Sequence, residues 1–169
     1  MDRPGALSGR SRAQQELIGA VRGFARARLP DDPAVCVGLS GGADSLALTA
    51  AAVRAGLQVT ALVVDHRLQE DSAAVAERAA AAARDLGARA QILPVDVTGG
   101  GGPEAAARTA RREALRAAAG TRPVLLGHTL DDQAETVLLG LGRGSGARSL
   151  AAMADWTPPW GRPLLRVRR

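Results

Sequence analysis

The fold of this chain is decided by the stretch AVCVGLSGGADS at Ala34–Ser45. Its apolar first half predicts a buried strand, and the alanine-rich run from Leu46 to Arg54 predicts a helix. Between them, Gly41 and Gly42 let the main chain turn tightly and approach a ligand closely. The N–H groups of such a turn and of a helix N-terminus attract anions. The stretch therefore predicts a strand–turn–helix unit that binds phosphate.

The residues from Ser40 to Ser45 carry side chains suited to a polyphosphate. Ser40 and Ser45 offer hydroxyl donors, and Asp44 places a carboxylate among them, which a bridging divalent cation would explain. The lysine-dependent phosphate loop of kinases and GTPases is excluded, because the chain contains no lysine and all 22 basic residues are arginine. The alternative is a glycine turn with an N-capping residue.

Strands and helices alternate along the rest of the sequence. We expect a first domain boundary near residue 33, with a helix and linker at 1–33 and an ATP-binding catalytic domain at 34–169. The alternation predicts an α/β fold with a doubly wound, Rossmann-like parallel sheet, whose ligands lie beyond the carboxyl ends of the strands. The expected strands are Ala34–Leu39, Gln58–Val64, Ala88–Val95 and Pro123–Leu126, and the expected helices are Gln14–Arg28, Asp44–Ala55, Asp71–Leu86, Pro103–Ala119 and Asp131–Leu141.

Two further segments follow predicted strands and should face the same crevice. Asp65 and His66 follow the second strand, where they would flank a nucleotide's base and ribose, although a polar turn explains them equally well. The second segment, Gly127–Thr136, places His128 beside a helix start that carries three acids. Acidic side chains at a helix start interact favourably with the helix dipole and cap free N–H groups. Three of them, however, are more than capping requires. The three acids are Asp131, Asp132 and Glu135.

Three arginines are candidates for gripping phosphates. Arg108 and Arg111 are three residues apart on one predicted helix and share a face. Arg143 lies in a glycine-rich loop where the backbone can approach a phosphate. The planar guanidinium fork binds two oxygens at once. A solvated helix face is the alternative for Arg111 and Arg112.

Composition narrows the class of protein further. A net charge of +5 and a pI of about 11.2 fit a nucleic-acid partner. The single cysteine, Cys36, falls in a predicted buried strand and reads as a core residue, and two histidines with one cysteine argue against structural zinc. No apolar segment reaches the roughly 18 residues of a membrane helix, and no secretion signal opens the chain, so we expect a cytoplasmic protein without membrane contact.

Four blocks of the chain, met in the same order, resemble the N-terminal catalytic domain of the tRNA(Ile)-lysidine synthase family, which belongs to the N-type ATP pyrophosphatases. The resemblance covers about Ala34 to Leu165. Its fourth block distinguishes this family from the asparagine, GMP and NAD synthetases, which share the first. The blocks are SGGADS at Ser40–Ser45, DHRL at Asp65–Leu68, the helix with Glu104, Arg108 and Arg111, and GHTLDDQAETVLLGLGRGSGARSLAAM at Gly127–Met153.

The resemblance implies a PP-loop fold and a carbon–nitrogen ligase. Such an enzyme uses ATP to adenylate the wobble cytidine of the CAU anticodon of isoleucine tRNA, and free lysine then displaces AMP to form lysidine. ATP and Mg²⁺ are the implied cofactors, and the tRNA anticodon loop and lysine are the implied partners. A homodimer stays open as an assembly.

The resemblance also implies roles for individual residues. Pyrophosphate would bind at Ser40, Gly41, Gly42, Ala43, Asp44 and Ser45. Asp44 and Asp132 would hold Mg²⁺, and Arg108, Arg111 and Arg143 would grip phosphates or the tRNA backbone. Glu135 and Asp131 would attract the cationic lysine, His128 would reach the adenylated base, and Asp65 and His66 would lie along the nucleoside.

The chain departs from the family pattern in three places. Arg112 stands where a tyrosine is usual, Gly99–Gly102 makes one loop unusually rich in glycine, and family members continue past Leu165 with elements that hold tRNA.

Two other interpretations would explain part of the sequence. A thiolating PP-loop enzyme or an amidotransferase would share the loop, but the cysteine pairs and the glutaminase segment that these need are missing. A nucleotide-sensing module would bind ATP without needing an acidic cluster opposite the loop.

Overall fold

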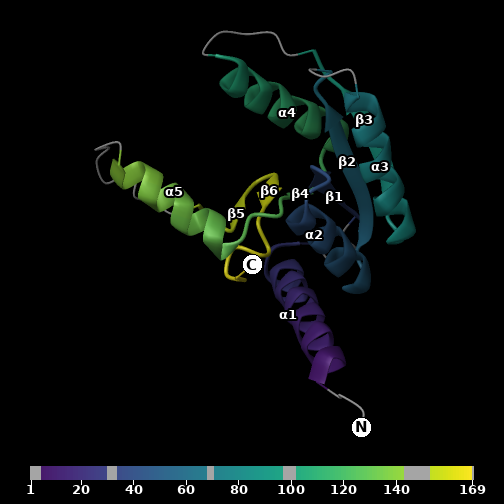
Figure 1. Cartoon of the computed structure of the whole chain (residues 1–169), viewed down its shortest axis with the longest axis vertical. Helices are drawn as coiled ribbons and strands as arrows, with labels where there is room; N and C mark the ends of the chain where they lie inside the picture. The colour runs from purple at the N-terminus through teal and green to yellow at the C-terminus, as the bar shows by residue number, and fades with distance from the viewer. Residues whose placement is uncertain (1–4, 30–33, 68–70, 97–101, 143–152, 169) are drawn as a thin grey trace.

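The computed structural model describes residues 5–29, 34–67, 71–96, 102–142 and 153–168. Within these residues, six strands form one sheet in the order β3-β2-β1-β4-β6-β5 (Figure 1). The elements are α1 (Gly5–Arg28), β1 (Ala34–Leu39), α2 (Ala43–Arg54), β2 (Gln58–Asp65), α3 (Ser72–Asp85), β3 (Arg89–Pro94), α4 (Pro103–Ala119), β4 (Val124–Leu125), α5 (Leu130–Gly142), β5 (Trp156–Thr157) and β6 (Trp160–Gly161).

The sheet is parallel except at one edge. β1 pairs in parallel with β2 on one side, from Ala34↔Gln58 to Leu39↔Val63, and with β4 on the other. β3 and β6 add parallel neighbours at the two flanks, and only β5 runs antiparallel, to β6. The order reverses on either side of β1, so the predicted doubly wound α/β fold is confirmed, with its switch point between β1 and β4.

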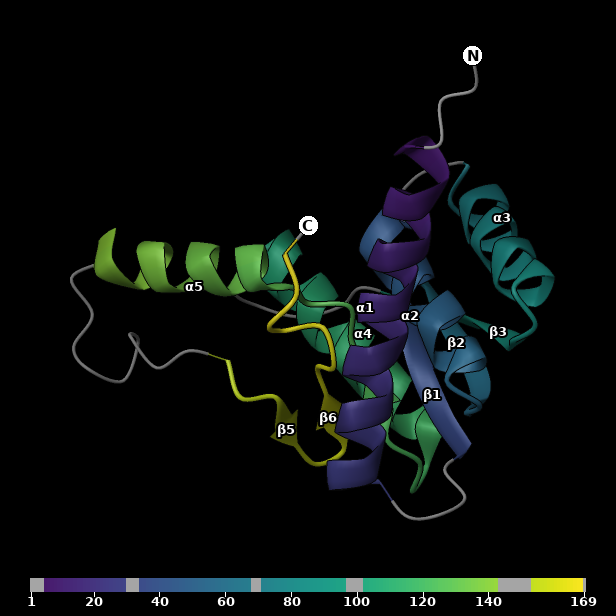
Figure 2. The ribbon, with the colours of Figure 1, turned by 90° about the horizontal axis from the view of Figure 1, so that it is seen from below.

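Each face of the sheet buries its own core. Helices α2 and α3 cover one face, and α1 packs against α2 (Figure 2). Val21 and Phe24 of α1 join that core, beside Val37 and Leu48. Helix α4 covers the other face, where Leu115 is buried. Because both faces are covered, β1 is a continuous apolar run with five of its six residues buried.

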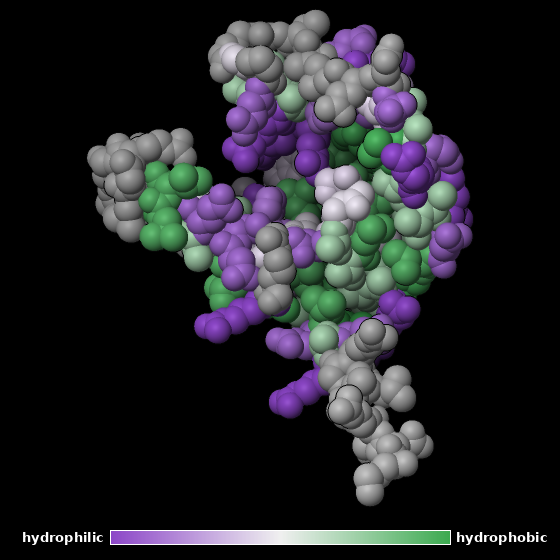
Figure 3. Space-filling view, viewed as in Figure 1, coloured by the Kyte–Doolittle hydropathy of each residue, from purple (hydrophilic) through white to green (hydrophobic). Residues whose placement is uncertain are grey.

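Helix α5 differs from the other helices. It projects from the body of the molecule in both Figure 1 and Figure 2. Leu138 and Leu139 on it are 66% and 51% exposed, and Figure 3 shows a hydrophobic patch there. Among the described residues, no helix combines the length and apolar character needed to cross a membrane.

The hairpin of β5 and β6 was not predicted. The last strand expected from the sequence was Pro123–Leu126, because two-residue strands carry no periodicity. The hairpin joins the sheet through Val124, whose N–H donates to the Pro159 carbonyl at 2.8 Å, and through Leu126, whose N–H donates to Gly161 at 2.8 Å. Trp156 packs edge-on against Phe24 of α1, with ring centroids 5.8 Å apart.

Most element boundaries lie within two residues of their predicted positions. The exception is α1, which begins at Gly5 rather than at Gln14. The predictions for Arg143, Leu68 and Gly99–Gly101 fall outside the described residues.

Candidate active site

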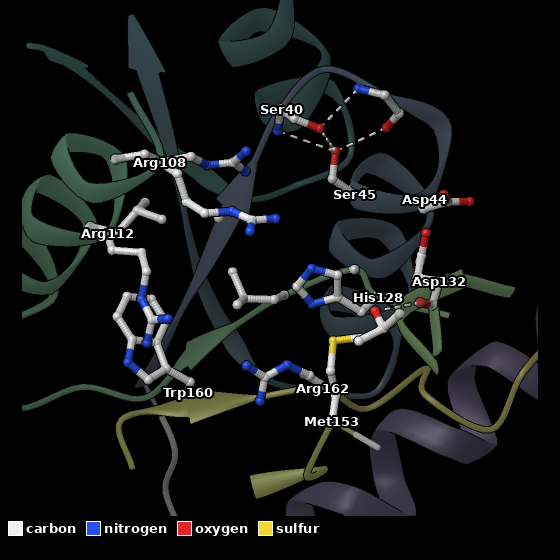
Figure 4. A pocket seen from close by; sticks show the side chains of 17 residues that line it. Ser40, Asp44, Ser45, Arg108, Arg112, His128, Asp132, Met153, Trp160 and Arg162 are labelled. Atoms are coloured by element: carbon white, nitrogen blue, oxygen red, sulfur yellow. Dashed lines mark hydrogen bonds between the residues drawn. The ribbon is translucent and has the colours of Figure 1, made fainter. Parts of the chain in front are cut away.

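A cavity of about 550 Å³ opens at the carboxyl ends of β1 and β4. Figure 3 shows the molecule hollowed between α4 and α5, with hydrophilic side chains of α4 along the edge of the hollow. The residues that line it come from five separate segments of the chain (Figure 4). They are Gly38, Ser40, Gly42, Asp44, Ser45, Arg108, Arg111, Arg112, Leu115, Leu126, Gly127, His128, Asp132, Thr136, Met153, Trp160 and Arg162.

The loop after β1 is held by hydrogen bonds of its own. Ser45 Oγ donates to the Gly42 carbonyl at 2.9 Å and accepts from the Ser40 N–H at 3.3 Å. The Ser40 and Ser45 hydroxyls lie 3.2 Å apart (Figure 4). Gly41 has a φ of +81°, which side chains rarely tolerate. The loop is thus shaped before any ligand arrives, with its N–H groups at the start of α2.

Gly127 follows β4 and lets the end of that strand lie against this loop. A Cβ atom at Gly127 would lie 3.1 Å from the Asp44 carbonyl carbon and oxygen and from the Ser45 nitrogen. All three are backbone atoms, which cannot move aside cheaply. The absence of a side chain therefore lets the turn after β4 contact the first turn of α2.

Asp132 both caps α5 and faces the cavity. Its Oδ2 accepts the Thr129 N–H at 2.7 Å and the Thr129 hydroxyl at 3.0 Å. Thr129 directly precedes the helix and the acid lies three residues later, so the bond from the Thr129 N–H is the acidic half of a capping box. The capping role and the cavity-facing role were posed as alternatives from the sequence, and Asp132 combines them.

Asp44 and Asp132 both line the cavity, and Figure 4 shows them next to each other. In the described part of the chain, no group of three or more His, Cys, Asp or Glu side chains could hold a metal. A Mg²⁺ ion usually takes only one or two carboxylates and completes its shell with phosphate oxygens and water. The two aspartates fit that donor set, and they do not fit a cation bound by protein alone.

Arginine side chains line the cavity across from the two aspartates. Arg108, Arg111 and Arg112 come from α4, and the Arg112 guanidinium lies 4.9 Å from the centre of the Trp160 ring. Burial, and then the neighbouring Arg108 charge, lower the pKa of Arg111 below its ordinary value. The cavity therefore has cationic groups that can bind an anion across from the two carboxylates.

His128 lies between these groups and is held neutral. Its pKa is lowered from 6.5, chiefly by burial and then by the Arg162 charge, with further lowering from Arg111 and Arg108. Asp132 opposes the shift. An uncharged imidazole can donate or accept a hydrogen bond without adding charge to a reacting phosphate.

Several predicted site residues do not line the cavity. Asp65 is buried at the end of β2, where its Oδ1 accepts the Arg67 N–H at 3.0 Å. That bond and one from Ser72 lower the pKa of the carboxyl. His66 follows it on the same edge of the sheet. Asp131 and Glu135 are exposed on α5.

Nine lining residues were not assigned a role from the sequence, among them Arg112, Met153, Trp160 and Arg162. The Met153 backbone is fixed by the Gln133 side chain, which accepts from its N–H at 2.7 Å and donates to its carbonyl at 3.4 Å. Trp160 and Arg162 lie on the β5–β6 hairpin. The only signal for them was the pair of tryptophans that flanks two prolines, Trp156 to Trp160.

Comparison with known proteins now identifies the family. The sequence profile of the PP-loop domain matches residues 13–169. The chain belongs to the ATP-binding PP-loop domain family. The resemblance drawn from the sequence is confirmed as well. This PP-loop domain is 67% identical over 155 residues to a tRNA(Ile)-lysidine synthase of Rhodococcus opacus, covering 91% of the chain and 47% of the relative.

Other relatives agree. A tRNA(Ile)-lysidine synthase of Mycolicibacterium paratuberculosis is 59% identical over 170 residues, which is 100% of this chain and 50% of that protein. The PP-loop domain thus spans about half the length of the curated relatives it matches.

Solved structures of other proteins share the fold. The U34-tRNA thiolase NcsA from Methanococcus maripaludis, with its [4Fe-4S] cluster, superposes with a TM-score of 0.76 at 21% identity, over 94% of this chain and 61% of that chain. An NH3-dependent NAD synthetase from Campylobacter jejuni gives 0.60 at 17% identity, over 94% and 68%. At these identities the likeness establishes the fold alone.

Proposed function

We propose that the protein ligates lysine to C2 of the wobble cytidine in the CAU anticodon of isoleucine tRNA, using ATP. One observation carries the proposal. The Ser40–Ser45 loop, Asp132 and His128 line a single cavity in a chain 67% identical over 155 residues to a tRNA(Ile)-lysidine synthase. Family membership supports the use of ATP.

The first step joins AMP to the base. Cytosine O2 attacks the α-phosphorus of ATP, and the bond to the β-phosphate breaks to release pyrophosphate. The loop N–H groups and the Ser40 and Ser45 hydroxyls bind the departing pyrophosphate. Arg108 and Arg111 face the charge that develops on the transferring phosphoryl group, where preorganised cations lower the barrier.

Asp44 and Asp132 are the residues that would hold Mg²⁺. The ion would supply positive charge to the phosphate oxygens. The bonds from Thr129 to Asp132 fix that carboxylate, and the contact between Gly127 and the start of α2 fixes where Asp44 sits relative to it.

The second step transfers lysine. The lysine ε-amino group attacks C2 of the adenylated cytosine, and AMP leaves with the electrons of the C–O bond. Glu135 and Asp131, both exposed on α5, would draw the cationic amino acid. Neutral His128 would contact the base, Asp65 and His66 would lie along the ATP nucleoside, and Arg143 would grip phosphate.

The positive charge of the chain supports an RNA partner. A net charge of +5 attracts the phosphate backbone. An anticodon loop supplies a base that unstacks at lower cost than one in a duplex. We place the reaction in the cytoplasm, without membrane contact, and keep a homodimer as the assembly to test.

The test is incubation with ATP, Mg²⁺, labelled lysine and isoleucine tRNA bearing CAU. The proposal expects label in the tRNA and pyrophosphate release that requires both ATP and tRNA. A tRNA with UAU in place of CAU is the matched control and should stay unlabelled. Pyrophosphate release without tRNA, or none in its presence, would contradict the proposal. Because the curated relatives are about twice as long, the assay should include the chain joined to a relative's C-terminal half.

A thiolation reaction receives less support. The neighbouring thiolase structure is titled with a [4Fe-4S] cluster, and clusters of that kind are held by several cysteine thiolates. The present sequence has one cysteine, Cys36, which is buried in β1. Burial raises the pKa of its thiol, which lowers its reactivity further.

A further inference from the structure

Arg162 lines the cavity and has no part in the steps above. Its side chain sits on the hairpin side, and Figure 4 shows the guanidinium between Trp160 and His128. One hydrogen bond holds this side chain and another holds its backbone. Nη1 donates to the Ala154 carbonyl at 2.9 Å, and the backbone N–H of Arg162 donates to the Asp155 carbonyl at 2.8 Å. Its position is therefore set by the hairpin and does not depend on the phosphate loop.

The remaining edge of this guanidinium carries a donor without a partner. Within the described part of the chain, the buried Nε of Arg162 makes no hydrogen bond, and neither does the buried Nδ1 of His128. A buried polar group left unpaired costs about 1–3 kcal/mol. Arginine Nε is a donor only, and it shares one edge of the planar fork with Nη2. That edge is complementary to a ligand with two acceptors side by side.

The position of Arg162 favours a base over a phosphate as that ligand. Phosphates, carboxylates and the O2/N3 edge of cytosine all present adjacent acceptors. The cavity lining includes Met153, Trp160, Leu126 and Leu115, and Arg112 is close enough for its charge to lower the pKa of Arg162. Apolar and indole side chains suit a flat heteroaromatic ring. The loop that suits phosphates lies on the other side of the cavity.

We propose that Arg162 donates from Nε and Nη2 to N3 and O2 of the target cytosine and thereby selects cytosine over uracil. The proposal rests on the proposed function for the identity of the base. Uracil carries an N3–H donor, which would face the Nε–H donor of Arg162. Cytosine O2 has two lone pairs, so one can accept from Arg162 while the other attacks phosphorus. Because Nε is covered in the structure, entry of the base requires a small rotation of the guanidinium.

The experiment is a ligand-observed NMR titration with cytidine, uridine and free lysine, in the presence of Mg²⁺ and a non-hydrolysable ATP analogue. The wild-type protein should bind cytidine about tenfold more tightly than uridine. Arg162→Lys keeps the charge but loses the fork, and Arg162→Gln loses both. Each variant should bind the two nucleosides equally, with the affinity for the ATP analogue unchanged. Arg166→Gln, at an exposed arginine of the same segment, is the matched control and should keep the preference.

Three results would overturn the proposal: no cytidine preference in the wild type, a preference retained in both variants, or a loss of ATP-analogue or lysine affinity in place of cytidine affinity. Thermal melts check that each variant folds. If Arg162→Gln does not fold, the result for Arg162→Lys decides the proposal. The labelled-lysine assay separates the two proposals. A cytidine preference without incorporation counts against the proposed function alone, and incorporation without the preference counts against the role of Arg162 alone.

Discussion

The two sides of the cavity are built in different ways. One is a single continuous segment, β1, the Ser40–Ser45 loop and the start of α2, and it fixes itself through hydrogen bonds between residues five or fewer apart. The other is assembled from α4, the turn after β4, the start of α5 and the β5–β6 hairpin. The local side matches a pattern common to the family, whereas the assembled side depends on contacts between distant segments. We infer that the first side holds the pyrophosphate of ATP, and that the second side adds charge around the phosphates and chooses the acceptor.

The largest effect is expected where the two sides meet, at the paired aspartates. Asp44→Asn and Asp132→Asn should each lower Mg²⁺-dependent pyrophosphate release by about 100-fold or more, because a neutral amide replaces a carboxylate that would hold the ion. Asp132→Asn keeps an oxygen that can accept the Thr129 N–H, so its melting temperature should stay close to wild type.

Asp131→Asn is the matched control, since Asp131 is exposed and lies outside the cavity lining. Its effect should appear in the KM for lysine and leave pyrophosphate release at saturating lysine nearly intact. Full activity in Asp132→Asn would remove this residue from the cation site.

Two glycines test whether the sides can be perturbed separately. Gly127→Ala places a methyl group 3.1 Å from the backbone of Asp44 and Ser45, so it should weaken ATP binding as well as stability. Gly161→Ala meets Phe24 Cζ at 2.6 Å and Leu125 Cδ2 at 2.8 Å, which are side-chain ends, so it should reduce stability and leave ATP affinity intact. Each should cost about 1–3 kcal/mol, a fall of several degrees in melting temperature.

Gly23→Ala is the control for the two glycine variants. Nothing lies within 4 Å of its added methyl group in α1, so it should raise stability by up to about 1 kcal/mol. Calorimetry and ATP titration measure both quantities. Equal loss of ATP affinity in Gly127→Ala and Gly161→Ala would show that the two sides are not independent.

His128 offers a smaller, graded measurement. Its pKa should lie below 6.5 in the wild type and rise toward that value in Arg162→Gln, because one of the charges that disfavour the imidazolium is gone. As the pH falls below about 7, His128 becomes protonated in the unfolded chain but stays unprotonated in the folded protein. The free energy of unfolding should therefore fall as the pH drops from 7 toward the lowered pKa.

NMR titration of the imidazole protons measures the shift directly, and the chain has only two histidines to assign. A wild-type pKa of His128 at or above 6.5 would contradict the account.

The smallest effect is expected at Cys36. Cys36→Ala should cost about 1 kcal/mol through lost packing in β1 and leave lysine transfer unchanged. The labelled-lysine assay and a denaturant melt are sufficient tests. Abolished transfer in a folded Cys36→Ala protein would revive the thiol-dependent alternative.

The difference between a side built from one continuous segment and a side assembled from distant segments explains what could be predicted from the sequence. The boundaries of β1 and the turn to α2 follow from local periodicity, and the acids at the start of α5 are contiguous in the sequence. Trp160 and Arg162 reach the cavity only because β6 pairs with β4, and two-residue strands leave no pattern to detect. The cavity lining also leaves out Asp65 and His66, since β2 lies on the far side of β1 from β4.

We expect a cation to bridge the two sides over a nucleotide whose phosphates rest on the Ser40–Ser45 loop. A crystal structure with a non-hydrolysable ATP analogue and Mn²⁺, located by its anomalous scattering, would show this directly. The manganese peak should lie within coordination distance of both Asp44 and Asp132, in contact with phosphate oxygens above Gly41 and Gly42. A peak bound by neither aspartate, or phosphates lodged away from the loop, would contradict it.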